Sequence, residues 1–203
     1  MLEVKHLEVY GLDAAMRGLR NPLNSWNKGD TKDGIIGKND MELLLKLCKA
    51  GTSHRKVLRQ IMVSMDIKAS IAWWKDFDQY KVGTTTNSCS FMHTLHKQPL
   101  TMDDIETDGC SASGLAVVEA TVDEFNIIRN LYLETGDKMY WYDMLTILPY
   151  RTKQMRTWTG NYEILVNVIA QRTGHKQKEF ADFIAQVKAG CPYLCQIAEA
   201  CGL

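Results

Sequence analysis

The chain has 203 residues, of which 45% are hydrophobic and 24% charged, as is typical of one globular domain with its own core. Its 24 lysines and arginines balance its 24 aspartates and glutamates, so bulk charge indicates neither direct nucleic-acid binding nor an anionic membrane partner, and any anion site must be local. No signal-peptide pattern opens the sequence and no run of about 18 apolar residues predicts a membrane-spanning helix, so we expect a cytoplasmic protein.

The six cysteines are scattered, and a chain of this length does not need disulfides in order to fold, so we expect reduced thiols. Cys191, Cys195 and Cys201 lie close together in sequence, a spacing that some metal sites share. No histidine lies near them, and no other zinc-type spacing occurs. The pattern therefore favours thiols on a C-terminal helix over metal ligands.

In the N-terminal half, the spacing of apolar residues predicts two strands and three helices. The second helix would begin with a capping box made by Asn39 and Glu42, and Gly51 would end it. The predicted elements are a strand at 2–10, a helix at 12–19, a loop at 20–38, a helix at 39–51, a strand at 60–67, a helix at 69–81 and a polar loop at 83–90.

In the C-terminal half, Thr121 and Glu124 have the capping-box spacing for a helix that Gly136 would interrupt. We therefore expect a single α/β (α+β) domain over residues 1–203, in which helices pack on a mixed sheet. The predicted segments are an acidic surface excursion at 100–115, helices at 121–133 and up to 148, a strand at 151–159, helices at 162–173 and 178–188, and a tail at 189–203.

Arg172 lies on the apolar face of its predicted helix and not opposite it. Asn161 falls within the same face, about three turns earlier. The apolar residues of that face are Ile164, Leu165, Val168 and Ile169. An arginine in this position either extends past the helix end or binds an anion in a largely dry place. Basic residues are also favoured at helix C-termini by the helix dipole alone, so both interpretations stay open.

Lys81 repeats this pattern at the end of the helix predicted at 69–81. It projects onto the aromatic stripe of that helix, and a hydroxyl-rich loop follows it at once. The hydroxyl, amide and backbone N–H groups of such a loop suit phosphate oxygens, although most Ser- and Thr-rich loops bind nothing. The candidate ligands in the loop are Thr85, Asn87, Ser88 and Ser90.

Two segments carry a family resemblance. The segment TGNYEIL at 159–165 is followed by Gln171-Arg172 and then by Gln177. This asparagine, apolar helix and arginine resemble the C-terminal signature of flavin-dependent thymidylate synthases. In the centre, the segment from Gly51 to His54 resembles the family's Gly-His element. The predicted strand and helix follow it as they do in the family, and the loop TTNSCSFMH at 85–93 then resembles the family's S-x-N-E-x-S segment. The resemblance covers most of the chain and is greatest to a divergent group carried by bacteriophages.

Several positions depart from the family pattern. The family's Arg-His-Arg triplet corresponds to Tyr80-Lys81-Val82, its glutamate to Ser88, and its Arg-Tyr pair to Met92-His93. The resemblance thus supports the fold and a nucleotide pocket more strongly than flavin redox chemistry.

If the chain resembles the enzymes fully, it uses FAD, methylenetetrahydrofolate and NADPH to convert dUMP to dTMP, as a homotetramer with sites between subunits. The resemblance implies that Arg172 acts in catalysis by holding the pyrimidine edge. It implies nucleotide contacts from Lys81, Thr85, Asn87, Ser88, Ser90, Asn161, Arg172 and Gln177, and cofactor contacts from Lys81, His54 and Asn161.

Three functions remain open at this point. The chain is a flavin-dependent enzyme that modifies a pyrimidine deoxynucleotide, a non-catalytic nucleotide binder, or a structural protein that kept only the fold. In a phage, the second class would include anti-defence proteins that sequester a signalling nucleotide.

Overall fold

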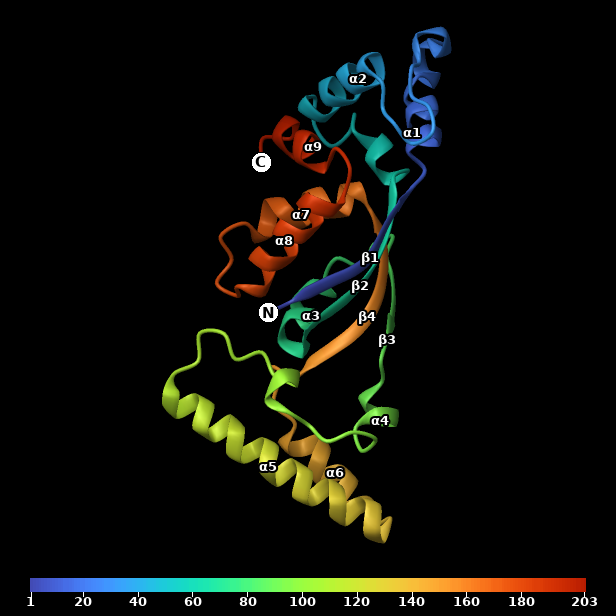
Figure 1. Ribbon diagram of the computed structural model, residues 1–203. Helices are drawn as coiled ribbons and strands as arrows, with labels where there is room; N and C mark the ends of the chain where they lie inside the picture. Colours follow the sequence, from blue (N-terminus) through green and yellow to red (C-terminus); the bar gives the residue numbers. More distant parts are fainter. The chain divides into compact units, whose positions relative to one another are not determined.

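The computed structural model describes all residues from Met1 to Leu203. Four strands form one sheet in the order β1-β2-β4-β3 (Figure 1), and helices accompany it, so the predicted α+β class is confirmed. The strands are β1 (Glu3–Tyr10), β2 (Met62–Ser70), β3 (Thr85–Ser88) and β4 (Lys153–Asn161). The helices are α1 (Leu12–Leu19), α2 (Lys38–Lys49), α3 (Ile71–Phe77), α4 (Phe91–Thr94), α5 (Ala112–Thr135), α6 (Lys138–Ile147), α7 (Tyr162–Arg172), α8 (Glu179–Gly190) and α9 (Leu194–Ala200).

The chain divides into two compact units, and strands β2, β3 and β4 contribute residues to both. One unit comprises Met1–Leu2, Lys68–Gln79 and Asn87–Arg156, and the other comprises Glu3–Ile67, Tyr80–Thr86 and Thr157–Leu203. A single domain over residues 1–203 stays a prediction.

The unit that contains Glu3–Ile67 is built from α1, α2, α7, α8 and α9. Helix α2 packs against α1 and α9, α7 packs against α8 and α9, and α8 packs against β1. In β2, Val63, Met65 and Ile67 are buried while the residues between them are half-buried, which is the alternation that predicted this strand.

The unit that contains Asn87–Arg156 is centred on the α5–α6 pair. Its hydrophobic core consists of Leu95, Leu100, Ile105, Val122, Phe125 and Met144. In α3, Trp73 stacks on Phe77 with ring centroids 4.4 Å apart, so the predicted aromatic stripe of this helix is buried. No helix of the protein is both long and apolar enough to cross a membrane.

The start of α2 corrects the predicted capping box. The helix begins at Lys38 with Gly37 as its N-cap, and no Asn39 side chain caps it. Instead, the Asp30 carboxylate accepts hydrogen bonds from the backbone N–H groups of Asn39 and Asp40, at 2.9 and 3.0 Å. A carboxylate from the preceding loop thus satisfies the free N–H groups that a capping box would have satisfied.

Three further boundaries differ from the prediction. Helix α3 ends at Phe77, so Lys81 lies outside it, and the segment expected to be a loop at 83–90 contains β3. Helix α5 begins at Ala112, inside the segment expected to be irregular, because the Ser111 side chain caps it by accepting from the Gly114 N–H. Thr121 is therefore an interior helix residue, and its hydroxyl donates to the Val117 carbonyl at 2.8 Å.

Candidate functional site

Helix α7 carries Asn161 and Arg172 at its two ends. Asn161 is buried and caps the helix, because its Oδ1 accepts from the Ile164 N–H at 3.2 Å. Arg172 is the last residue of the helix and is half-buried. The helical spacing that predicted this pair is confirmed, with Asn161 anchored and Arg172 projecting from the C-terminal end.

A buried ion pair fixes the first turn of α7. The Arg55 guanidinium donates from Nε to Glu163 Oε2 and from Nη2 to Glu163 Oε1, both at 3.1 Å. Burial lowers the pKa of Arg55, but the hydrogen bonds and the charge of Glu163 outweigh it, so the pKa is raised. The Arg55 guanidinium therefore stays charged at neutral pH, and the ion pair holds the first turn of α7 in place.

The Arg172 guanidinium lies between two aromatic rings. Its Cζ atom is 4.8 Å from the centroid of the Phe180 ring and 5.6 Å from that of the Tyr80 ring. Its Nε donates to the Tyr80 hydroxyl at 3.0 Å, and its Nη1 lies 3.1 Å from Nε2 of His175. No carboxylate pairs with it, so its charge is stabilised by rings and dipoles alone and stays available to a ligand.

The segment after α3 brings Tyr80 to α7. Gly83 adopts a left-handed backbone with φ of 77°, and a Cβ atom there would contact Nδ2 of Asn161 at 3.7 Å. The Thr84 hydroxyl donates to the Tyr80 carbonyl at 3.1 Å and closes the turn. The segment 80–84 therefore passes Asn161 and places the Tyr80 side chain at Arg172.

Lys81 belongs to this segment but does not have the predicted environment. The residue is exposed and lies beyond the end of α3, so it does not share the buried aromatic face. The physical reason is the early end of the helix, which leaves residues 78–84 to form a turn. Tyr80, which is half-buried, takes the place at Arg172.

The hydroxyl-rich candidates divide between the two compact units. Thr85 lies in the same unit as Arg172, whereas Asn87, Ser88 and Ser90 lie in the other unit. The side chains of Thr85, Asn87 and Ser88 on β3 are exposed, and Ser90 is half-buried. Their predicted role as phosphate ligands stays a prediction.

Gln177 contacts His175, the histidine that lies next to Arg172. Its backbone N–H donates to Nδ1 of His175 at 3.2 Å, and its side-chain Nε2 donates to Glu179 Oε2 at 3.1 Å. The same histidine packs edge-on against the Phe180 ring, with centroids 4.9 Å apart. Gln177 therefore helps to position His175, which in turn faces Arg172.

His54 lies apart from these residues. It is exposed and lines a cavity of about 270 Å³ together with residues of α1 and of the turns around it, and none of the other candidate residues lines that cavity. No group of three or more His, Cys, Asp or Glu side chains is arranged to hold a metal ion.

Three residues at this site were not predicted to belong to it: Tyr80, His175 and Phe180. Tyr80 looked like one more member of an aromatic helical face, and the other two follow the helix that carries Arg172. Only the tertiary fold brings them to one guanidinium, and no local pattern signals this.

No family model matches the sequence, and no curated protein is significantly similar to it. Solved structures do match. A thymidylate synthase X from Helicobacter pylori, crystallised with FAD and dUMP, has 19% sequence identity, a TM-score of 0.73 and coverage of 99% of both chains. A second structure, a flavin-dependent thymidylate synthase from the same organism complexed with FAD and dUMP, has 18% identity, a TM-score of 0.71 and coverage of 98% of both chains. The chain therefore has the fold of the flavin-dependent thymidylate synthases.

Proposed function

We propose that this chain binds a nucleotide and that Arg172 is the principal anchor of that ligand. The observation that carries the proposal is the state of its guanidinium, which is half-buried between the rings of Tyr80 and Phe180 and has no carboxylate partner. A cation in such surroundings is usually paired, because partial burial without an opposite charge is costly. A phosphate or the carbonyl edge of a base supplies the missing acceptor.

The donors that remain on Arg172 suit such a ligand. Nε is occupied by the Tyr80 hydroxyl, which leaves Nη2 and the outer N–H of Nη1 free to donate. These N–H groups form one planar edge of the guanidinium, and that edge matches two acceptor oxygens. The Tyr80 hydrogen bond and the contacts with the Tyr80 and Phe180 rings hold the edge in one orientation before the ligand arrives, which lowers the entropic cost of binding.

The ligand class that we propose is a pyrimidine deoxynucleotide such as dUMP, which both of the matching structures described above contain. The base edge would accept from Arg172, and Gln177 would act through His175. Lys81 and Thr85, which lie in the same compact unit as Arg172, are the proposed phosphate ligands, and the role of Asn87, Ser88 and Ser90 stays a prediction. Because no carboxylate competes for the guanidinium, Arg172 can stabilise negative charge on the ligand, and in an enzyme of this fold the same group would stabilise charge that develops on the ring.

Flavin chemistry is a separate question, and the proposed FAD residues do not fit one site in this chain. Asn161 uses its side chain to cap α7, Lys81 is exposed, and His54 lines a cavity that neither of the others reaches. The geometry favours a nucleotide binder, with sequestration of a nucleotide as its function, over a full thymidylate synthase.

Calorimetry and a thermal-shift panel test this proposal. The panel contains dUMP, dCMP, dTMP, FAD and cyclic nucleotides, and a ligand at about 100 times its dissociation constant stabilises the fold by about 2.7 kcal/mol. Arg172→Lys keeps the charge but loses the planar edge, so we expect it to weaken binding by about 1.5–3 kcal/mol. Lys176→Ala, an exposed cation nearby, is the control and should bind like the parent. The proposal fails if no nucleotide raises the melting temperature.

The alternative enzyme is distinguished by absorbance. A yellow preparation with flavin bands, together with release of dTMP from dUMP in the presence of methylenetetrahydrofolate and NADPH, would favour the flavin-dependent synthase that the shared fold makes a candidate. A colourless protein that binds nucleotide with full occupancy would favour the binder.

A further inference from the structure

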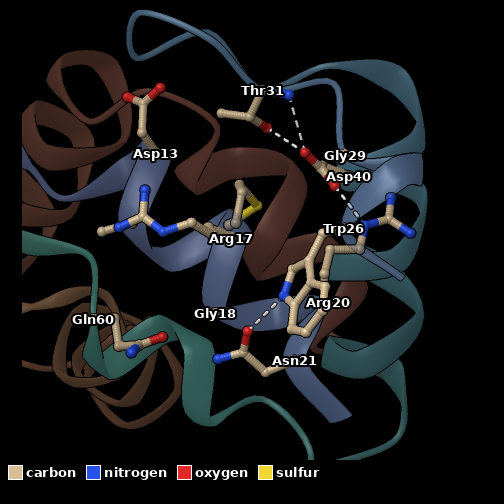
Figure 2. Close-up of a pocket in the computed structure, with 12 residues that line it drawn as sticks. Asp13, Arg17, Gly18, Arg20, Asn21, Trp26, Gly29, Thr31, Asp40 and Gln60 are labelled. Carbon is tan, nitrogen blue, oxygen red and sulfur yellow. Dashed lines mark hydrogen bonds and ion pairs between the residues drawn. The ribbon is translucent and has the colours of Figure 1, made fainter. Parts of the chain in front are cut away.

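A second cavity of about 690 Å³ lies in the same compact unit and shares no residue with the surroundings of Arg172. One face of α1 and the loop that follows it form the cavity (Figure 2). Its volume falls within the range of sites that hold small organic ligands, roughly 300–1,000 Å³. The residues around it that carry the argument are Arg17, Gly18, Arg20, Trp26, Asp40 and Gln60.

The loop that forms one wall of the cavity is fixed by two aspartates. Asp40, buried on α2, accepts from the backbone N–H groups of Asp30 and Thr31 at 3.1 and 3.0 Å, and from the Thr31 hydroxyl at 2.7 Å. The Asp30 carboxylate in turn holds the start of α2. Hydrogen bonds therefore join the loop and the start of α2 in both directions, so this wall of the cavity is preorganised even though most of the loop is exposed.

Arg20 is held by the same aspartate and is left with an unmatched donor. The residue is 7% exposed, and its Nε donates to Asp40 Oδ1 at 2.8 Å. Its Nη2 atom is buried and has no hydrogen-bond partner. The unmatched N–H group is a local cost of this arrangement, and because the atom is shielded it offers no donor to the cavity, so the Arg20–Asp40 pair serves to fix the cavity wall.

The base of the cavity is a small-residue patch on α1. A Cβ atom at Gly18 would approach Oε1 of Gln60 to 2.9 Å, so the absence of a side chain at Gly18 allows the Gln60 carboxamide to lie over the helix. This carboxamide makes no hydrogen bond within the protein. One free carbonyl and one free amide group side by side match the alternating donor and acceptor groups at the edge of a nucleobase.

Trp26 lies on the opposite side of the cavity from Gln60 and Arg17 (Figure 2). Its ring is 54% exposed, an unusual state for a tryptophan, and its Nε1 donates to Oδ1 of Asn21 at 2.8 Å. The hydrogen bond fixes the ring, so its exposed face is a platform on which a planar ring can stack.

Arg17 supplies a cation at the open side of the cavity. It is exposed and forms no ion pair, even though Asp13 lies four residues earlier on the same helix. The Asp13 carboxylate also lines the cavity but accepts from the Gly34 N–H at 2.8 Å. Asp40 already accepts from four donors, so the Arg17 guanidinium is the exposed charged group of the cavity that has free donors.

We propose that this cavity is a second ligand site and that it takes a nucleoside monophosphate. The base stacks on Trp26 and pairs its edge with Gln60, and the phosphate pairs with Arg17. The three groups supply the three interactions that a nucleotide offers: a ring face, a polar edge and an oxyanion.

The test uses the full chain carrying Arg172→Lys, so that binding at the α7 site is weakened and the two sites are distinguishable. Probes are AMP, GMP, CMP and UMP, the corresponding nucleosides, and inorganic phosphate, followed by tryptophan fluorescence and calorimetry. Arg17→Gln should raise the dissociation constant of the monophosphate that binds best by roughly tenfold or more and leave that of its nucleoside unchanged. Trp26→Ala should raise both by roughly tenfold and abolish the fluorescence change.

Lys32→Ala, an exposed cation of the same loop that does not line the cavity, is the matched control and should bind like the parent. Trp26 and Arg17 are exposed, so both variants should keep the parental far-ultraviolet circular dichroism. The proposal is overturned if no monophosphate binds at millimolar concentration, or if Arg17→Gln and Trp26→Ala titrate like the parent. Equal binding of inorganic phosphate and of the nucleotide would also overturn it, because the ring would then contribute nothing.

Discussion

The Nε atom of Arg172 donates a hydrogen bond to the hydroxyl of Tyr80 at 3.0 Å, between residues 92 positions apart in the chain. The same hydroxyl donates to Oε1 of Gln171 at 3.0 Å, so it is held from two sides. The guanidinium thus has one fixed orientation although it is at a helix end, where a long side chain normally samples many rotamers. This orientation exposes the planar edge on which the proposed nucleotide site depends.

Tyr80→Phe tests the orienting hydroxyl. The ring and its cation–π contact remain, so the fold should be retained, but the loss of one hydrogen bond should weaken nucleotide binding by about 1 kcal/mol. Calorimetry with the nucleotide that the thermal-shift panel identifies gives the measurement. Tyr142→Phe, at a tyrosine that is 60% exposed, serves as the control. Equal affinities in all three proteins would show that Tyr80 does not position Arg172.

The positions of Asn161 and Arg172 could be predicted because both depend on one local period. Helix α7 runs from Tyr162 to Arg172, and the spacing of its apolar residues already places the two ends on one face. Tyr80 could not be assigned to the site, because its contact with Arg172 depends on where α3 ends. That end is set by the turn that follows Phe77 and not by the apolar stripe, which continues to Tyr80 in sequence.

In the rest of the fold, too, features set by a local sequence pattern could be predicted and features set by distant contacts could not. The strand at β2 and the helix at α1 agree with the prediction, because alternation is strong in β2, and in α1 the helical spacing is strong and Gly11 marks its start. The capping boxes at Asn39 and Thr121 were wrong, because their spacing is common and a competing group, Asp30 in one case and Ser111 in the other, satisfies the N–H groups. The second cavity was not predicted, since its walls come from distant segments.

Asp40→Asn should destabilise the protein by about 3–5 kcal/mol, because it leaves the buried Arg20 guanidinium without its charged partner. Chemical denaturation of the two proteins at pH 7 measures the difference in the free energy of unfolding. Asp123→Asn, at an exposed carboxylate on α5, should change that free energy by less than about 0.5 kcal/mol. A difference for Asp40→Asn no larger than the control would contradict the importance of the pair.

The destabilisation should also depend on pH. Burial raises the pKa of Asp40, but hydrogen bonds from Thr31 and Arg20 outweigh it, so the folded-state pKa lies below the ordinary value of 3.8. A lowered pKa contributes stability that is present above pH 3.8 and is lost as the pH falls through the folded-state value. The gap between parent and Asp40→Asn should therefore be constant from pH 7 to about 5 and close at lower pH. A gap that widens on acidification would refute this assignment.

The cysteines should fall into distinct reactivity classes. Burial raises the pKa of Cys48 and of Cys191 to about 12, so at pH 8 almost no thiolate exists at either residue. Cys89, Cys110 and Cys195 are exposed and should react with a thiol-specific chromogenic reagent in the native protein. Cys48 and Cys191 should react only after denaturation. Release of chromophore from all six cysteines at a single rate in the native protein would contradict the buried environments.

Helices α5 and α6 expose an apolar surface, defined here by Val117, Ile127, Leu133, Met139 and Tyr142, whose exposed fractions lie between 53% and 64%. Only Val122 and Phe125 of the 24 residues in α5 are buried. Exposed apolar side chains of this kind are typical of an interface, and we propose a second copy of the chain as the partner, in line with the homotetramer that the family resemblance implies.

We therefore expect light scattering to give a mass well above 23.1 kDa at micromolar concentration. Val117→Glu or Ile127→Glu should lower that mass, because each places a charge where an apolar contact would be desolvated. Glu134→Gln, on the same helix at an exposed polar position, is the matched control and should leave the mass unchanged. If light scattering shows that the parent protein is a single 23.1 kDa species, the oligomer is contradicted, and so is any site that a neighbouring subunit would complete. The Arg172 contacts, which lie within one chain, would survive that result, so nucleotide binding by a monomer would remain testable with the same variants.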